Sequence, residues 1–420
     1  MLFLKKNYKI VLFTFLIILV FYRSPYIFLN GRFVAEEGSF WFRNAYLFGP
    51  IKGLTQILWG TNYFNLWANI SSVLASLVNI KFAPFITVYM SALVIIFLLL
   101  YIIYSESDFI QTIKDRIVIS LAVLLSPAIS SSVWLNTLVS QVYLSLIVIL
   151  IYFQKDKSKN FFNRFSPVVV FIATMSSLIP CILLPFFYKK YRSFKSKLNF
   201  SVFILMLVGT IFQLFIFLYS KFTGIEKLTQ DGIRFLISEE KIINFFYNVI
   251  LKPFLGRDLT QILYYEIFNK YYFVLSIFLL SFSYIFLKKI IVIIKKDKIL
   301  QSLLIFFVLE SIFAIVGSKG DQVQGRYAVV PSTLIILFVY RLSLLAKSNI
   351  KFISNFLIVL CLVIGFTEYK FNNKYPQFLK CINCPEWKNE IIKWQDDKSY
   401  QIKIWQYPQK TMDLDISRAY

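Results

Sequence analysis

The sequence predicts an all-α, polytopic integral membrane protein: a helical bundle of about eleven spans with outer-face loops and a small outer C-terminal tail. Hydrophobic residues make up 58% of the 420 positions, and the mean hydropathy is +0.66. A soluble domain is only about 45–50% apolar. Long apolar runs recur along the whole chain, and about 20 such residues cross a hydrocarbon core. These observations exclude an ordinary soluble enzyme, a disordered chain and a collagen-like fibre. They also argue against an outer-membrane barrel, whose strands alternate in polarity.

The first span is expected to follow a basic N-terminus. Lys5, Lys6 and Lys9 precede the apolar run Ile10–Tyr22. A basic flank before a short apolar core also occurs in signal peptides. No small-x-small cleavage site follows, however, and the apolar character continues past Arg23. We therefore expect a retained helix whose N-terminus lies in the cytoplasm.

Further apolar segments follow along the chain, and two of them, on either side of Pro180, are short. These two are expected to form half-helices or one re-entrant unit. The uncharged stretch Leu66–Ile80 is too short to span and is expected to be an interfacial helix. The other predicted spans are Phe85–Tyr104, Ile117–Trp134, Leu138–Phe153, Pro167–Ser177, Leu178–Tyr188, Leu198–Tyr219, Tyr271–Leu287, Ile299–Val316, Ala328–Leu345 and Phe352–Phe366.

The distribution of charge predicts the orientation. The net charge is +23, from 45 Lys+Arg against 22 Asp+Glu. When the N-terminus is placed in the cytoplasm, the short loops that are dense in Lys and Arg all fall on that side, as the positive-inside rule requires. Most acidic residues then fall on the other side. The sequence thus predicts a multi-pass membrane protein with its N-terminus in the cytoplasm and its C-terminus outside, and no nucleic-acid partner is needed to explain the charge.

This topology predicts two domains. Residues 1–366 form the transmembrane domain, with long outer loops at 23–84 and 220–270. Residues 367–420 form the extracytoplasmic tail. Trp387, Trp394 and Trp405 are spread through the polar tail, which indicates an ordered structure.

The first outer loop contains two adjacent carboxylates, Glu36 and Glu37, among aromatic residues. The chain has no histidine, which excludes Ser-His-Asp and Cys-His catalysis and any histidine-bound metal. Neighbouring side chains diverge, so one carboxylate can face a site while the other orients it. Nearby like charge and apolar surroundings raise a carboxyl pKa toward the range of a general base. The alternative is an acidic pair that caps the following helix. A divalent cation remains open as a cofactor.

A second polar loop, Gly317–Tyr327, is punctuated by glycines and reaches the membrane surface at Arg326. An arginine binds phosphate oxygens through two parallel hydrogen bonds, and glycines let the backbone approach a ligand. The candidate phosphate-binding residues are Arg326, Lys319 and Tyr327. The alternative is a flexible connector with an interfacial Arg-Tyr anchor.

Other polar residues are candidates for substrate binding. Glu310 lies within a predicted span, where an ionisable residue indicates function by default; a structural salt bridge is the alternative. Asn136 and Gln141, beside Trp134, form a polar and aromatic cluster at an outer turn, although turn polarity alone also explains them. Asp321 and Gln324, in the glycine-punctuated loop, complete the set.

The four cysteines fall into two kinds. Cys181 and Cys361 lie in apolar segments and are expected to be inert. Cys381 and Cys384 form a Cys-x-x-Cys pair in the tail. Without histidine or a second such pair, a tetrahedral zinc site is not expected. A local disulfide is plausible in an oxidising compartment.

The stretch Phe33-Val34-Ala35-Glu36-Glu37-Gly38-Ser39-Phe40-Trp41-Phe42 resembles the F-W-A-E-D-G-x-x-F-F motif of a bacterial family of polytopic membrane proteins. That family is similar to GT-C-type glycosyltransferases. The resemblance continues in short motifs along most of the chain, with Glu37 where the family usually has Asp. These motifs are Leu135-Asn136-Thr137-Leu138, Gly325-Arg326-Tyr327 with Pro331, Cys384-Pro385-Glu386-Trp387 and Ile402-Lys403-Ile404-Trp405.

The resemblance implies a membrane glycosyltransferase that uses a polyprenyl-phosphate-linked sugar as donor and a glycan, glycolipid or protein as acceptor. Glu36 or Glu37 would deprotonate the acceptor hydroxyl, and Arg326 with Lys319 would stabilise the departing lipid phosphate. The alternatives are a lipid flippase or transporter, a glycan polymerase or ligase of another fold, and a structural subunit of an envelope assembly. A flippase typically shows internal repeats, and none is detectable.

Overall fold

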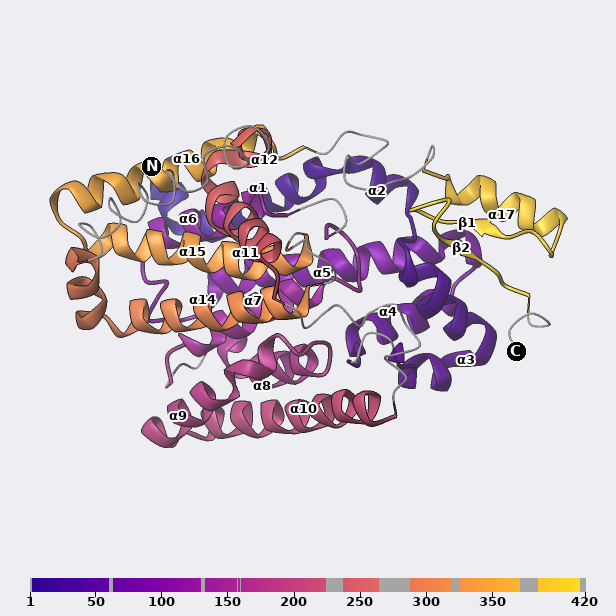
Figure 1. Cartoon of the computed structure of the whole chain (residues 1–420), viewed down its shortest axis with the longest axis horizontal. Coiled ribbons are helices and arrows are strands. Elements are labelled where there is room, and N and C mark those ends of the chain that lie inside the picture. The colour runs from indigo at the N-terminus through magenta and orange to yellow at the C-terminus, as the bar shows by residue number, and fades with distance from the viewer. Residues whose placement is uncertain are drawn as a thin grey trace. The chain divides into compact units, whose positions relative to one another are not determined.

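A computed structural model describes residues 2–59, 63–129, 133–156, 158, 160–223, 237–263, 288–318, 323, 325–370 and 384–415. These residues are mostly helical and include one short two-stranded sheet (Figure 1). The chain divides into two compact units. The first comprises 1–111, 130–232 and 371–420, and the second comprises 112–129 and 233–370.

The first unit contains long apolar helices together with a smaller part built from the first loop and the tail. Its helices are α1 Leu2–Arg23, α2 Pro25–Asn30, α3 Arg43–Thr55, α4 Leu66–Ser76, α5 Ala83–Tyr104, α7 Gln141–Tyr152, α8 Phe161–Thr174, α9 Leu184–Phe194, α10 Lys197–Phe222 and α17 Trp387–Asp396. The shorter elements are the π-helical turn η1 Glu37–Phe42 and the 3₁₀ turns η3 Ile80–Phe82 and η4 Pro180–Leu183. Strands β1 Ile402–Lys403 and β2 Thr411–Met412 pair in antiparallel fashion.

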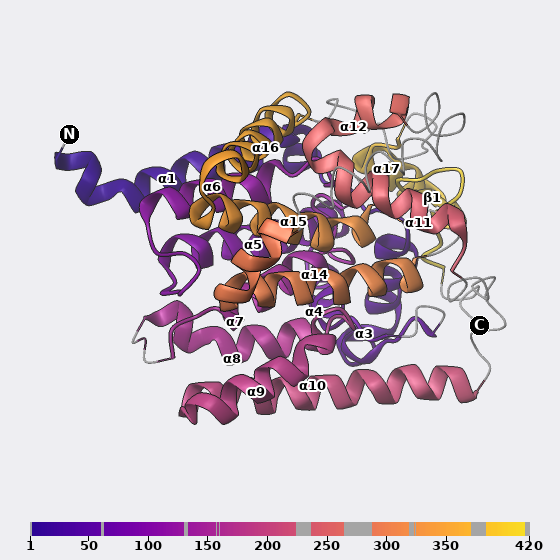
Figure 2. The same ribbon diagram turned by 60° about the vertical axis from the view of Figure 1, so that its left-hand side comes forward.

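The second unit is a group of helices with a small hydrophobic core and with buried and partly buried polar contacts between helices. In Figures 1 and 2, α14 and α15 lie side by side. Asp297 caps α14 by accepting from Leu300 N at 2.7 Å and forms a 2.7 Å ion pair with Arg341 of α15. Tyr340 donates to Asp115 of α6 at 2.6 Å. The elements are α6 Ile113–Leu125, α11 Glu239–Phe245, the π-helical turn η6 Phe246–Leu251, α12 Lys252–Ile262, α14 Lys298–Gly317, α15 Arg326–Leu345 and α16 Ser348–Thr367.

Within the described residues, five helices are long and apolar enough to cross a membrane, by length and composition. They are Ile80–Tyr104, Lys197–Phe222, Lys298–Gly317, Arg326–Leu345 and Asn349–Thr367. Such helices are typical of a membrane protein. The predicted number of about eleven spans, the membrane type and the topology are not confirmed.

The other predicted spans differ from the structure for local reasons. The run from Ile117 forms α6 only as far as Leu125, because the chain turns at Pro127, and the residue before a proline disfavours helical backbone. The apolar helices α7 and α8 have 12 and 14 residues. That is short of the roughly 20 a perpendicular span needs. The predicted span Tyr271–Leu287 lies outside the described residues.

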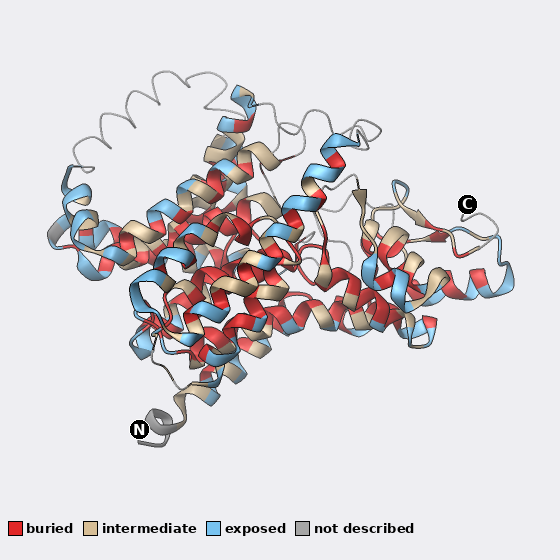
Figure 3. Cartoon of the chain, turned by 90° about the horizontal axis from the view of Figure 1, so that it is seen from below, coloured by how far each residue is buried: buried red, intermediate tan, exposed pale blue. Residues whose placement is uncertain are grey.

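The first loop and the tail form one folded part, here called the cap and defined as residues 24–82 and 384–415. A common hydrophobic core joins them, and Figure 3 shows buried residues in both. The helix expected over Leu66–Ile80 is present as α4. All three tail tryptophans are buried, so the described part of the tail is ordered as they predict. The core residues include Phe33, Phe42, Ile80, Trp387, Ile391, Trp394, Ile402, Ile404, Met412 and Leu414.

A glycine lets α8 and α10 approach closely within the first unit. A Cβ added at Gly209 of α10 would lie 2.7 Å from the Cβ of Thr174 and closer still to its hydroxyl. We expect Gly209→Ala to lower the free energy of unfolding by about 1–3 kcal/mol, because overpacking a tight contact costs about that much. Thermal unfolding in detergent measures this.

Gly317→Ala is the matched control, since its added Cβ would have its nearest neighbour at 3.7 Å. That variant should unfold at the wild-type temperature or slightly above it. Equal melting temperatures for Gly209→Ala and wild type would show that the approach of α8 to α10 is not tight.

Candidate functional site

The loop that carries the acidic pair is held in place by the tail. Val34 and Trp405 form a parallel β-bridge, in which Trp405 N donates to Phe33 O at 3.1 Å and Ala35 N donates to Trp405 O at 3.3 Å. Ala35 has a positive φ of 49°, which turns the chain from this bridge into η1. Two of the short motifs in the sequence, around Phe33 and around Trp405, are therefore adjacent in the structure.

Glu37 points into the protein and is 1% exposed. Its Oε1 accepts hydrogen bonds from Thr137 N at 2.9 Å and Thr137 Oγ1 at 2.5 Å. Its Oε2 accepts from Val34 N at 3.2 Å. Burial raises the pKa of Glu37 above its ordinary value, while these hydrogen bonds and the charge of Arg32 oppose the rise. Glu37 thus fixes the loop against the turn at 134–137, and both of its oxygens are already used.

Arg32 lies beside this carboxylate and is also buried, at 1% exposure. Its Nη2 donates to Trp134 O at 2.6 Å, and its guanidinium carbon lies 4.8 Å from the centre of the Trp405 ring. Burial lowers the pKa of Arg32 to about 10, and the charge of Glu37 opposes this shift. Arg32 therefore remains a cation at neutral pH.

Glu36 diverges from Glu37 and lies at the surface, with 39% of its side chain exposed. Its Oε1 forms a 3.0 Å ion pair with Lys410 Nζ from the tail. Its side chain makes no capping hydrogen bond at the start of η1. The acidic pair is therefore not a helix cap in this structure: Glu37 is enclosed, and Glu36 is accessible.

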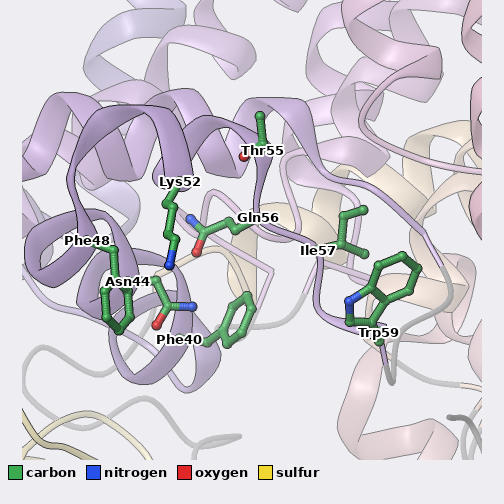
Figure 4. Close-up of a pocket in the computed structure, with 8 residues that line it drawn as sticks. All are labelled: Phe40, Asn44, Phe48, Lys52, Thr55, Gln56, Ile57 and Trp59. Carbon is green, nitrogen blue, oxygen red and sulfur yellow. The ribbon is translucent and has the colours of Figure 1, made fainter. Parts of the chain in front are cut away.

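The helical segment that follows the acidic pair lines a cavity of about 350 Å³. Its lining combines aromatic rings with amide, hydroxyl and ammonium groups. In Figure 4, Lys52 and Gln56 point toward Asn44 and Phe40, whereas Ile57 and Trp59 lie on the other side. The lining residues are Phe40, Asn44, Phe48, Lys52, Thr55, Gln56, Ile57 and Trp59.

Gln56 in this lining has an unused acceptor. Its Nε2 donates to Trp41 O at 3.1 Å, and its backbone oxygen accepts from Asn69 Nδ2 at 3.0 Å. Its Oε1 is buried without a hydrogen-bond partner. Buried acceptors are normally satisfied, so a ligand hydroxyl in the cavity is a suitable donor for this oxygen.

The polar residues predicted at the outer turn form hydrogen bonds within the protein. Asn136 Oδ1 accepts from Leu138 N at 3.0 Å, and Gln141 Nε2 donates to Tyr63 OH at 3.3 Å. Asn136 is 4% exposed and Gln141 6%. The turn contributes to the site chiefly through its neighbour Thr137, which binds Glu37.

The remaining candidates belong to the second unit. Arg326 opens α15, where its Nη2 donates to Tyr327 OH at 3.1 Å and its guanidinium stacks on the Tyr327 ring at 5.0 Å. Glu310 lies in α14, is 2% exposed and has an Oε1 without a hydrogen-bond partner. The predicted residues Lys319, Asp321 and Gln324 lie outside the described residues.

The cysteines and the acidic side chains were also considered as a disulfide and as metal ligands. Cys384 is in a disulfide, Cys181 and Cys361 are free, and Cys381 lies outside the described residues. Over the part of the chain that the structure describes, no group of three or more Cys, Asp or Glu side chains could hold a metal ion.

Sequence reasoning missed several residues of this site. Arg32 and Lys410 were not singled out, Trp134 was named only as the aromatic neighbour of Asn136 and Gln141, and Gln56 lies between motifs. One signal was present for Thr137, which belongs to the Leu135–Leu138 motif, although the motif does not show that it binds Glu37.

The chain is thus a mostly helical protein with helices suited to a membrane, and its cap carries an enclosed carboxylate, a buried arginine and a cavity. Comparisons with known proteins return no match: no family model matches the chain, no curated protein matches it, and no solved structure matches it. The function is therefore inferred from the residues of the cap and their geometry.

Proposed function

We propose that this chain is a membrane glycosyltransferase. It transfers a sugar from a polyprenyl-phosphate donor to a glycan, glycolipid or protein acceptor on the outer face of the bacterial cytoplasmic membrane. The observation that carries the proposal is the cavity of the cap. Its aromatic and amide lining begins in the sequence at Phe40, shortly after Glu36, whose carboxylate is accessible.

The spacing of these residues places them on one helical face. Glu36, Phe40, Asn44 and Phe48 are each four residues apart in continuous helical structure from η1 into α3. Residues four apart are neighbours on a helix surface. The Glu36 carboxylate therefore stands at the end of a row of residues that lines the cavity.

The composition of the cavity suits a sugar. Ligand sites are concave, largely apolar and supplied with a few polar groups that orient the ligand. Aromatic rings provide flat apolar faces, while Asn44 and Gln56 supply amide donors and acceptors that match hydroxyl groups. A polyol bound here would place a hydroxyl against Gln56 Oε1, which has no other partner.

Glu36 is then the general base. As the acceptor hydroxyl attacks the anomeric carbon of the donor sugar, its proton passes to the Glu36 carboxylate, and the bond to the donor phosphate breaks with inversion. The ion pair with Lys410 does not lock the carboxylate away, because an exposed pair of this kind contributes only about 0–1 kcal/mol. Glu37, whose oxygens are both used, positions the loop.

Arg326 and Tyr327 are proposed separately, as contacts of the donor phosphate together with Lys319. Arg326 stands at the start of α15, and the N-terminus of a helix favours an anion. The resemblance of Gly325-Arg326-Tyr327 to the family motif supports the same assignment.

We expect Gln56→Ala to lower glycan transfer about fivefold, because one hydrogen bond of about 1 kcal/mol to the acceptor is lost. The measurement is the amount of modified envelope glycan in the native host at limiting protein level. Gln111→Ala is the control, since this exposed residue donates its side-chain amide to Asp108 O at 2.7 Å and does not line the cavity. Equal glycan in both variants at matched protein level would contradict the assignment of the cavity.

The second candidate is a lipid-linked glycan flippase or transporter. Glu310 favours it, because a buried carboxyl without a partner on its Oε1 inside an apolar helix is typical of a transport pathway. A flippase moves the lipid-linked sugar without breaking the sugar–phosphate bond, so product analysis separates the two functions.

A further inference from the structure

The cavity of the cap carries a positive charge that comes from one side chain. Of the described residues that line it, Lys52 alone is charged. Its ammonium lies 4.9 Å from the centre of the Phe48 ring, in a cation–π contact. No carboxylate in the part of the chain that the structure describes forms an ion pair with Lys52. The cavity therefore presents a cation to its ligand.

A kink in α3 directs this cation toward the amides of the cavity. Gly49 has a φ of 85°, which interrupts the helix between Phe48 and Lys52. Glycine adopts this conformation without the strain that a side chain would bring. Beyond the kink, Lys52 and Gln56 point toward Asn44 (Figure 4). The ammonium and the two amide groups are thus directed into the same part of the cavity.

We propose that this part of the cavity binds an acidic sugar of the acceptor, with the Lys52 ammonium paired to the sugar carboxylate. The inference rests on the proposed function, because it takes the cavity as the acceptor site. A hydrogen bond between an ammonium and a carboxylate is about twice as strong as one between neutral groups. The buried Oε1 of Gln56, which has no hydrogen-bond partner, accepts from a hydroxyl of the same sugar.

A carboxylate suits this cavity better than a phosphate does. A carboxylate has one negative charge, which one ammonium balances. A phosphate monoester has about 1.5–2 negative charges at neutral pH, and the described lining contains no second cation. Arginine, the residue that binds phosphate oxygens in pairs, is absent from the described lining.

The reacting hydroxyl belongs to a different sugar unit of the acceptor. Asn44 follows Glu36 by two steps of four residues in continuous helical structure. Since a helix rises about 1.5 Å per residue, the two residues lie about 12 Å apart along the axis. A carboxylate held near Asn44 is therefore well separated from the Glu36 carboxylate, and the two negative charges do not oppose each other closely. The acceptor class is thus an acidic oligosaccharide.

The test measures the binding of two matched sugars to the full-length protein in a polyoxyethylene ether detergent, which contains neither sugar nor charge. The probes are methyl β-D-glucuronide and methyl β-D-glucoside, which differ only where the first has its carboxylate. Saturation-transfer NMR gives the dissociation constants. We expect the wild type to bind the glucuronide about tenfold more tightly, the effect of one hydrogen bond to a charged group. High salt should weaken this preference, because the pair is accessible to solvent.

Three variants assign the preference to one ammonium. Lys52→Gln should bind both sugars equally, with glucoside binding little changed, and Lys52→Arg should keep the preference because it keeps the charge. Lys81→Gln is the matched control, since it removes the same charge from an exposed residue of the cap that does not line the cavity. It should bind both sugars as the wild type does. A third probe, glucose 6-phosphate, should bind the wild type no more tightly than the glucuronide.

Four results would overturn the inference. They are equal binding of the glucuronide and the glucoside to the wild type, a preference that survives in Lys52→Gln, a preference that is lost equally in Lys81→Gln, and tighter binding of glucose 6-phosphate. Each of these leaves the proposed function standing, because the cavity still binds a sugar. Binding of none of the probes would overturn both the inference and the cavity as acceptor site. A glucuronide preference that depends on Lys52, in a protein that transfers no sugar, would support the inference and contradict the glycosyltransferase.

Discussion

Replacing Glu36 with glutamine is expected to lower sugar transfer at least about 100-fold, because positioned general bases contribute about 10²–10⁴-fold and an amide cannot take up the acceptor proton. The variant keeps the size of the side chain, and Glu36 is accessible rather than enclosed. Folding and protein level should therefore stay at their wild-type values. The measurement is envelope glycan in the native host, normalised to the amount of protein in the membrane.

Lys410→Gln is the control that separates the carboxylate from its ion pair. It removes the partner of Glu36 but leaves the base in place. We expect this variant to retain transfer within a few-fold of the wild type. Wild-type glycan in Glu36→Gln, at an unchanged protein level, would show that Glu36 is not the base.

Glu37→Ala is expected to lower the free energy of unfolding by about 3–5 kcal/mol, the range found when one member of a buried charged network is removed. The substitution leaves the N–H and hydroxyl of Thr137 and the N–H of Val34 buried without their acceptor. It also leaves Arg32 without its neighbouring negative charge. Unfolding in detergent measures the loss. A change below about 1 kcal/mol, the size of an ordinary surface substitution, would contradict the enclosed geometry.

The same carboxyl predicts a dependence of stability on pH. Burial raises the pKa of Glu37 in the folded protein above that in the unfolded chain. The folded state then holds the proton more tightly, so this contribution is fully present below the unfolded pKa and is lost as pH rises through the folded pKa. The Gln side chain of Glu37→Gln cannot titrate. A plot of its melting temperature against pH should therefore lack the contribution of this carboxyl. An identical slope in wild type and variant would assign the dependence to other groups.

The sequence predicted the helical class of the protein, because that class depends on local patterns of apolar residues. Apolar runs such as Phe85–Tyr104 and Leu198–Tyr219 correspond to α5 and α10 within a few residues. The span that begins at Ile117 was predicted to continue to Trp134, whereas α6 ends at Leu125, because hydropathy alone does not detect the turn at Pro127. The predicted domain division at 366/367 stays a prediction.

The contacts of the site depend on chain segments that are far apart. Nothing in the local sequence around Glu36 and Glu37 shows which of them turns inward. That outcome depends on Thr137, which binds Glu37, and on the tail, where Trp405 pairs with the loop and Lys410 meets Glu36. Arg32 was missed for the same reason, since its partner Trp134 belongs to a distant turn.

The most direct test of the proposed glycosyltransferase is product analysis with the purified protein and membrane extract of the host as the source of acceptor. A polyprenyl-phosphate sugar labelled in the sugar is supplied as donor. We predict that the wild type moves the label to a new acceptor and releases free polyprenyl phosphate, and that Glu36→Gln does neither. Intact donor after incubation with the wild type, under conditions in which the host membrane itself supports transfer, would contradict the proposal.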